Sequence, residues 1–195
     1  MNPAFQLKTQ PVTFEEFLQQ EKDSEIRHEY NDGELVPLEA TTKAHNRIKR
    51  NIIRQVETEK FEASGCQLFD ENVLTQLLEN RKAVYPDIVI TCDSRDDDPL
   101  LVKFPAVIFE ILSDSTQRYD KTLKFFRYQR LPSLQQCIFV AQSKMEVRSF
   151  LRTEDNRWEL TLLEKPHEIL EIPVLNVSIS LAEIYRNISV VSSEV

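Results

Sequence analysis

The sequence has only two glycines, Gly33 and Gly65, among its 195 residues. The GxGxxG and P-loop motifs that bind nucleotide phosphates need several glycines, so both are excluded. Long apolar runs are also missing, since no stretch approaches the roughly 20 residues that span a bilayer. The first six residues lack the basic-then-apolar order of a signal peptide. The composition therefore favours one domain over residues 1–195 that does not enter a membrane.

Cysteine and histidine are also scarce. The three cysteines, Cys66, Cys92 and Cys137, are odd in number and form no CxxC motif, which favours reduced thiols in a cytoplasmic protein. Three histidines argue against a His/Cys zinc site, so we expect any bound metal to have mainly oxygen ligands. Magnesium and manganese are the ions that fit such ligands. The formal net charge of −8 argues against nonspecific coating of DNA, but it is compatible with a local basic groove.

Two apolar segments each contain one acid. Residues 106–112 read as a strand that is apolar on both faces, with Glu110 in its middle. Residues 83–92 read as a second such strand, with Asp87 directly after Pro86. Because an unpaired buried charge costs several kcal/mol or more, each carboxylate needs a partner. Convergence on a metal ion is one interpretation, and a helix cap or a pairing with arginine is the alternative.

The remaining pattern predicts a mixture of helices and strands. A capping box at Thr13–Glu16 starts a short helix to about residue 22, and Asn31-Asp32-Gly33 predicts a hairpin. A long helix is expected from residue 41 to about 64, and a strand from 67 to 76. Further on we expect a helix at 117–130, strands at 135–141, 144–151 and 158–163, a short strand near 170, and a helix from about 180.

The helix predicted at 41–64 has two distinct faces. Ile48 and Ile52 lie on its apolar face, and His45 points inward with them. A lone inward histidine is more often a satisfied core residue than a ligand. The opposite face carries a basic stripe of Lys43, Arg47, Arg50 and Arg54. A solvated charged face is the simpler interpretation of this stripe, and a ridge that contacts phosphates is the alternative.

The helix expected at 117–130 follows the strand of Glu110. Asp120, Lys124 and Tyr128 recur at intervals of four on one face, and Lys124 can reach back toward the carboxylate. Hydrolysis of a phosphodiester needs an activated water, neutralised phosphate oxygens and a cation near the developing charge. A divalent ion held by Asp87 and Glu110 supplies the first two, and a lysine can supply the third.

These motifs together resemble the PD-(D/E)XK restriction-endonuclease-like superfamily. More closely they resemble its Uma-type branch of endonucleases, in which a glutamate precedes an Asp-Gly hairpin and a histidine opens the next helix. Glu29 and His45 match those two positions. The resemblance covers about residues 13–185 and implies an α/β (α+β) fold, with a mixed β-sheet core flanked by helices.

The resemblance also implies a site. Asp87 and Glu110 would bind Mg²⁺ or Mn²⁺, Lys124 would be the catalytic lysine, and Glu29 an accessory acid. The cleft would be lined by His45, Asp120 and Tyr128. The sequence departs from the superfamily pattern at Leu112, which replaces the usual lysine two residues after the acid, and at Asp114, where proline is common.

A metal-dependent DNA endonuclease is therefore the favoured prediction, without an organic cofactor. A homodimer is expected, because cleavage of both DNA strands by such a fold usually needs two sites. The alternative is a catalytically inactive protein of the same fold that acts as a DNA-binding or interaction module. The acidic net charge and Leu112 favour this alternative.

Overall fold

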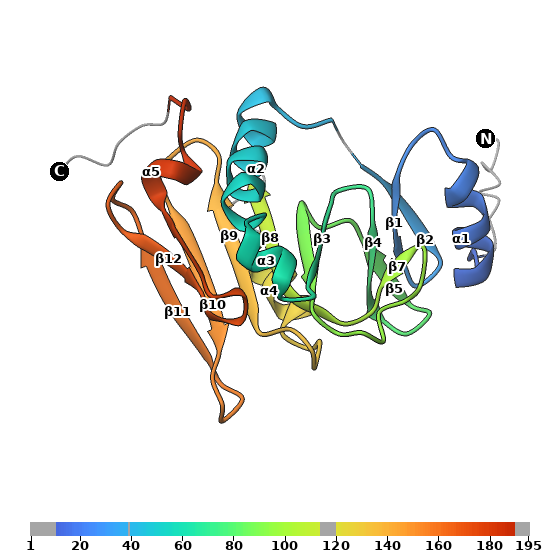
Figure 1. Ribbon diagram of the computed structural model, residues 1–195. Coiled ribbons are helices and arrows are strands. Elements are labelled where there is room, and N and C mark those ends of the chain that lie inside the picture. The colour runs from blue at the N-terminus through green and yellow to red at the C-terminus, as the bar shows by residue number, and fades with distance from the viewer. Residues whose placement is uncertain (1–10, 39, 114–119, 190–195) are drawn as a thin grey trace.

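The computed structural model describes residues 11–38, 40–113 and 120–189, with only the backbone for residues 120–123. Its central layer is a six-stranded mixed sheet with the order β11-β10-β9-β8-β6-β3 (Figure 1). β8 and β9 run parallel, and the other neighbours are antiparallel. The strands are β3 (Gln67–Asp70), β6 (Ile88–Thr91), β8 (Pro105–Leu112), β9 (Gln136–Ala141), β10 (Val147–Arg152) and β11 (Trp158–Leu163).

A second sheet, with the order β2-β1-β5-β4-β7, lies beside the first (Figure 1). Its strands are β1 (His28–Asn31), β2 (Glu34–Pro37), β4 (Leu74–Leu78), β5 (Lys82–Val84) and β7 (Leu101–Val102). The predicted hairpin is confirmed: Asp32 and Gly33 both have positive φ, at 49° and 94°, as a tight two-residue turn requires. A side chain at Gly33 would also collide with Pro11, since its Cβ would lie 2.4 Å from the Pro11 Cβ.

The predicted capping box is confirmed at the start of α1 (Phe14–Asp23), where Thr13 and Glu16 exchange hydrogen bonds. Apolar residues of this helix, Phe14 and Phe17, pack against Tyr30 of β1. The second sheet is thereby covered by α1.

Every residue of β8 is buried, which confirms the prediction of a central strand. Alternate side chains point to opposite faces. Phe109 and Ile111 pack in one core cluster with α2 (Lys43–Val56). Ile108 and Leu112 pack in another cluster with Tyr128 of α4 (Asp120–Tyr128). Glu110 shares the side of Ile108 and Leu112, so it faces α4.

The single helix predicted at 41–64 is wrong, because α2 ends at Val56 and α3 (Glu59–Ala63) begins anew. The side chain of Thr58 accepts a hydrogen bond from the backbone of Phe61 and caps α3. α2 packs on the same face of the sheet as the C-terminal elements. These are β12 (Ile169–Ile172), β13 (Val177–Ser180) and α5 (Leu181–Ile184).

Two strands predicted as continuous are each divided between the two sheets. The segment 67–76 becomes β3 and β4, and the segment 83–92 becomes β5 and β6. Pro86 interrupts the second segment, since proline has no N–H to donate to a ladder. β3 and β6 pair with each other, and Asp70 lies opposite Ile88. Glu71 and Asp87 lie where the chain passes between the two sheets, and both are therefore at the same end of the β3–β6 pair.

The expectation of reduced thiols is wrong for two of the three cysteines. Cys66 and Cys92 form a disulfide with a Cα–Cα distance of 4.1 Å, directly beside the paired residues Gln67 and Thr91. Sequence spacing missed this pair because 26 residues separate its members. Cys137 is free and buried. Within the described part of the chain, no helix has the length and apolarity needed to cross a membrane.

Candidate active site

A cavity of about 480 Å³ lies where the two sheets meet α2, β8 and α4. It gathers acids and cations from segments far apart in the sequence. Among the residues that line it are Glu29, His45, Glu71, Asp87, Glu110 and Lys124. Five of these six residues were predicted from the sequence, and Glu71 was not. The structure thus brings the predicted carboxylates and the predicted lysine into one cavity.

Asp87 is held from two sides. Its Oδ1 lies 2.9 Å from Nε2 of His45, which reaches it from the first turn of α2. Its Oδ2 accepts a hydrogen bond of 2.6 Å from the backbone N–H of Ile111, the residue after Glu110. The pairing of β6 with β8 places Asp87 beside this amide, because Ile88 lies opposite Phe109. The carboxylate is therefore fixed next to the strand that carries Glu110.

Glu110 is almost completely buried and has two partners on α4. Lys124 Nζ lies 3.0 Å from its Oε2, and the hydroxyl of Tyr128 donates to its Oε1. Burial raises the pKa of Glu110 to about 7, against the lowering effect of the Lys124 charge. The negative charge of Asp87 raises this pKa further, while the hydrogen bonds from Tyr128 and Lys124 lower it. The two carboxylates are thus close enough to influence each other.

Not every predicted residue lines the cavity. Tyr128 lies behind Glu110, and burial together with the Glu110 charge raises the pKa of its hydroxyl well above the usual value. Glu29 reaches the cavity from β1 and adds to the same rise in pKa. The side chain of Asp120 and the residues Asp114 to Thr116 lie outside the described part of the structure.

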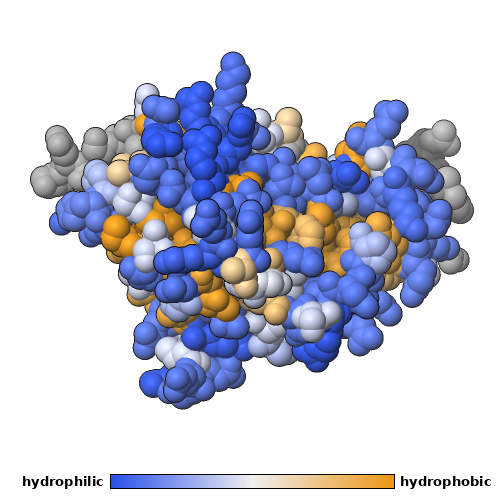
Figure 2. Space-filling view, viewed as in Figure 1, coloured by the Kyte–Doolittle hydropathy of each residue, from blue (hydrophilic) through white to orange (hydrophobic). Residues whose placement is uncertain are grey.

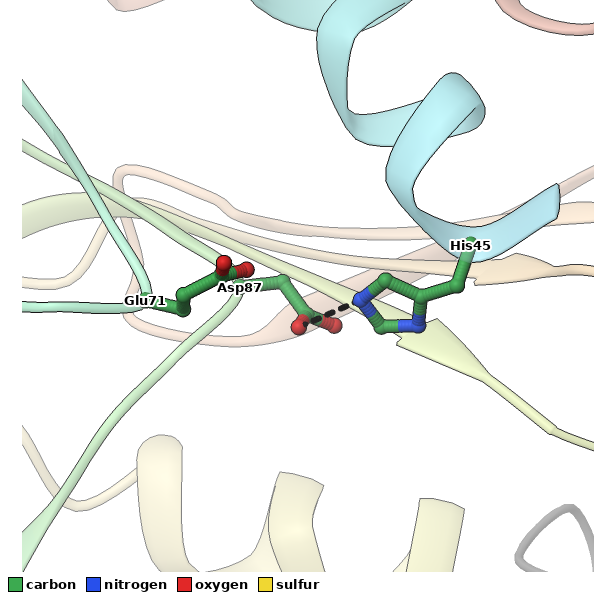
Figure 3. Close-up of side chains that lie close together, drawn as sticks. All are labelled: His45, Glu71 and Asp87. Carbon is green, nitrogen blue, oxygen red and sulfur yellow. Dashed lines mark hydrogen bonds and ion pairs between the residues drawn. The ribbon is translucent and has the colours of Figure 1, made fainter. Parts of the chain in front are cut away.

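Glu71 is the residue that the sequence analysis missed. It follows β3 directly, and a carboxylate oxygen of Glu71 lies within 4.8 Å of ligand atoms of His45 and Asp87. Figure 3 shows Glu71 and His45 approaching Asp87 from opposite sides. The buried ammonium of Lys49, one helical turn after His45, pairs with Glu71. The acidic run Asp70-Glu71 inside an expected strand was the available signal in the sequence.

The basic stripe of α2 lines a second cavity of about 660 Å³. Lys43, Arg47, Arg50 and Arg54 all contribute to its wall, and Arg186 joins them from the segment after α5. Thr41 and Thr42 line both this cavity and the acidic one, so the two are neighbours. Strongly hydrophilic side chains gather in Figure 2 over the part of the molecule where Figure 1 places α2.

The mixed sheet flanked by helices, with Glu110 buried on its central strand, is the arrangement that the restriction-endonuclease-like resemblance implied. A solved structure, described as a "putative nuclease belonging to DUF820" from Anabaena variabilis, matches this fold with a TM-score of 0.73. The match covers 89% of this chain and 97% of that chain, at 16% sequence identity. The fold predicted from the sequence is therefore confirmed.

The chain belongs to the Uma2 family, described as "Putative restriction endonuclease", whose model matches residues 14–183. Two curated relatives are described as uncharacterized proteins of Synechocystis sp., slr1290 and sll1609. The first is 27% identical over 90% of this chain and 92% of its own length. The second is 26% identical over 87% of this chain and 97% of its own length. The predicted resemblance to the Uma-type branch is confirmed.

Proposed function

We propose that this protein is a divalent-metal-dependent endonuclease that hydrolyses phosphodiester bonds of DNA. The observation that carries the proposal is the meeting of Asp87, Glu110 and Lys124 in one cavity, beside a second cavity lined with basic residues. The family description and the description of the solved neighbour both support a nuclease.

The pair of carboxylates fits a divalent ion. Asp87 and Glu110 offer oxygen ligands of the kind that Mg²⁺ and Mn²⁺ prefer. The charge of Asp87 raises the pKa of Glu110, so a cation between the two would favour the ionised form of Glu110. Such an ion, when bound, polarises a phosphate oxygen and lowers the pKa of water. Glu29 adds an accessory acid to the same cavity.

Lys124 replaces the lysine that the superfamily carries two residues after the acid. Leu112 occupies that position here and is buried, so it offers no charge. The ammonium of Lys124 lies instead beside Glu110, on the helix that packs over the same face of β8. What matters for catalysis is where the charge lies, since a fixed cation stabilises the charge that develops on the phosphate.

DNA would lie with its phosphates along the basic stripe of α2. Arginine and lysine side chains at a protein surface neutralise phosphates without reading the base sequence. The shared residues Thr41 and Thr42 would then mark the passage of the strand into the acidic cavity.

The second candidate is a nuclease-fold protein that binds DNA without cutting it. One observation favours it: Lys124 is already paired with Glu110, which reduces its freedom to contact a phosphate. Both candidates predict DNA binding along α2, and only the first predicts metal-dependent cleavage.

Nicking of supercoiled plasmid, with Mg²⁺ or Mn²⁺ and with EDTA, separates the two candidates. We expect cleavage by the parent chain with either ion, and none with EDTA. Asp87→Asn should abolish cleavage, whereas Asp155→Asn, an exposed loop substitution, should leave it unchanged. Cleavage that persists in Asp87→Asn would contradict the proposed site. DNA binding by the parent without cleavage would support the second candidate.

Lys124→Ala tests the lysine in the same assay. Loss of a positioned donor typically lowers the rate about 100-fold to 1,000-fold. Arg127→Ala is the matched control, because Arg127 is an exposed cation on the same helix. An unchanged single-turnover rate in Lys124→Ala would remove the lysine from the mechanism. The single domain, the cytoplasmic location and the homodimer stay predictions.

A further inference from the structure

The two oxygens of Asp87 face different parts of the structure. Oδ2 contacts the backbone of β8 beside Glu110, and Oδ1 faces His45 on α2. Glu71 lies on the other side of Asp87 from His45 (Figure 3), and ligand atoms of the three residues lie within 4.8 Å of one another. Asp87 is thus shared between two sets of neighbours, the Glu110 set and a set made of His45 and Glu71.

The geometry points to a second cation position, held by His45, Glu71 and Asp87 and containing one nitrogen ligand. We infer that this position takes a first-row transition-metal ion, with Mn²⁺ preferred over Mg²⁺. The inference builds on the proposed nuclease site and adds ligands that the carboxylate pair alone does not include.

The distance between His45 and Asp87 fits two adjacent ligands of a single ion. Adjacent ligands of an octahedral ion with bonds of about 2.1 Å lie about 3.0 Å apart. Nε2 of His45 and Oδ1 of Asp87 are 2.9 Å apart, and one ligand atom from each of His45, Glu71 and Asp87 lies within 4.8 Å of the others. His45 is 7% exposed, so its imidazole is held in place inside the fold.

The surrounding structure positions each of these ligands. α2 presents His45 and Lys49 one turn apart, and Lys49 holds Oε2 of Glu71. A carboxylate has two oxygens and several lone pairs, so Glu71 can bind Lys49 and an ion together. The pairing of Asp70 with Ile88 fixes Glu71 beside Asp87, and the Cys66–Cys92 disulfide closes the other end of this ladder.

The ligand type sets the preference for the ion. Imidazole nitrogen binds first-row transition metals better than it binds Mg²⁺, which prefers an all-oxygen shell. Two ions that share a carboxylate also match the arrangement in which one ion assists the attacking oxygen and the other the leaving oxygen of a phosphodiester.

The test measures ion binding to the full chain without DNA. Mn²⁺ is titrated by calorimetry, and pulsed electron paramagnetic resonance detects a ¹⁴N nucleus bonded to the ion. We expect a nitrogen coupling in the parent and in Glu110→Gln, and its loss in His45→Gln. Glu71→Gln should weaken Mn²⁺ binding at least tenfold, since even the loss of an outer partner costs about 10-fold to 100-fold. Glu62→Gln, an exposed change on α3, is the control and should bind as the parent does.

Two spectroscopic results would overturn the inference: no nitrogen coupling in the parent at saturating Mn²⁺, or a coupling that survives in a folded His45→Gln. Unchanged Mn²⁺ affinity in Glu71→Gln would overturn it as well, and that side chain is partly exposed, so the variant is expected to fold. Plasmid cleavage without nitrogen coupling would leave the proposed function intact and refute only this position. Nitrogen coupling without plasmid cleavage would support this cation position and refute the proposed nuclease function.

Discussion

Glu110 is a buried acid whose charge state depends on its surroundings. Its pKa is raised from the usual 4.5 to about 7, chiefly because burial disfavours the carboxylate. Between these two pH values the folded chain binds more protons at this residue than the unfolded chain does. The free energy of unfolding must therefore fall as pH rises from about 4.5 to 7, and Glu110 contributes no further change above that range.

This effect is expected to be measurable in metal-free protein. We expect Glu110→Gln to remove a loss of roughly 3 kcal/mol between pH 4.5 and 7, because one pKa unit corresponds to about 1.4 kcal/mol. Denaturant unfolding of the parent and the variant in EDTA, at several pH values from 4.5 to 8, gives the difference. Parallel stability curves over this range would mean that Glu110 is already ionised when folded. Glu154→Gln, in the exposed turn between β10 and β11, is the control.

Glu71 shows why residue-level prediction was incomplete. Asp87 and Glu110 stood out because each interrupts an apolar strand, and Lys124 because it follows Glu110 at helical spacing. Glu71 sits in a polar stretch of the sequence, where a solvated acid is the usual outcome. Only the crossing between two sheets brings it to His45, and a crossing of that kind leaves no periodic signal.

At the scale of elements, the two faces of α2 present side chains to two different cavities. Its inner face delivers His45 and Lys49 to carboxylates, and its outer face lines the basic cavity. We predict that Arg50→Ala weakens DNA binding about equally for all sequences. The slope of log affinity against log salt should fall by roughly one unit, because one phosphate contact is lost.

A fluorescence anisotropy titration at several salt concentrations measures that slope. Arg157→Ala is the matched control, since Arg157 is an exposed arginine in the turn between β10 and β11 and lies outside the basic cavity. Equal slopes for Arg50→Ala and the parent would mean that Arg50 contacts no phosphate and that the outer face of α2 is an ordinary solvated surface.

Elements with local signals were predictable from sequence. The capping box at Thr13, the hairpin at Asp32-Gly33 and the buried strand around Glu110 depend on neighbouring residues only. The points where predicted elements are interrupted were not predictable. α2 ends before Thr58, and the chain passes from one sheet to the other around Glu71 and around Pro86. The caps and the proline were visible in the sequence, but propensity alone does not show that a strand will leave one sheet for another.

At the scale of the whole molecule, an acidic chain carries a locally basic face. The chain carries a formal net charge of −8, yet one face gathers the basic stripe of α2 together with Arg186. A polyanion is repelled by most of such a surface and attracted to one cavity, which orients it before contact. The acidic net charge is therefore compatible with directed binding of DNA by either of the two candidate functions.

On the proposed function, one acidic cavity would cut one strand at a time, so cleavage of both strands in a single encounter would need two chains. We predict that the protein acts as a homodimer on DNA, and that parent dimers produce linear plasmid. Mixed dimers of parent and Asp87→Asn chains, co-expressed with different tags and purified through both, should produce nicked circles in place of linear DNA. Sedimentation with and without a DNA duplex gives the number of chains in the complex. If the protein sediments as one chain under both conditions and still linearises plasmid, cutting must proceed by two successive encounters, and the dimer prediction is wrong.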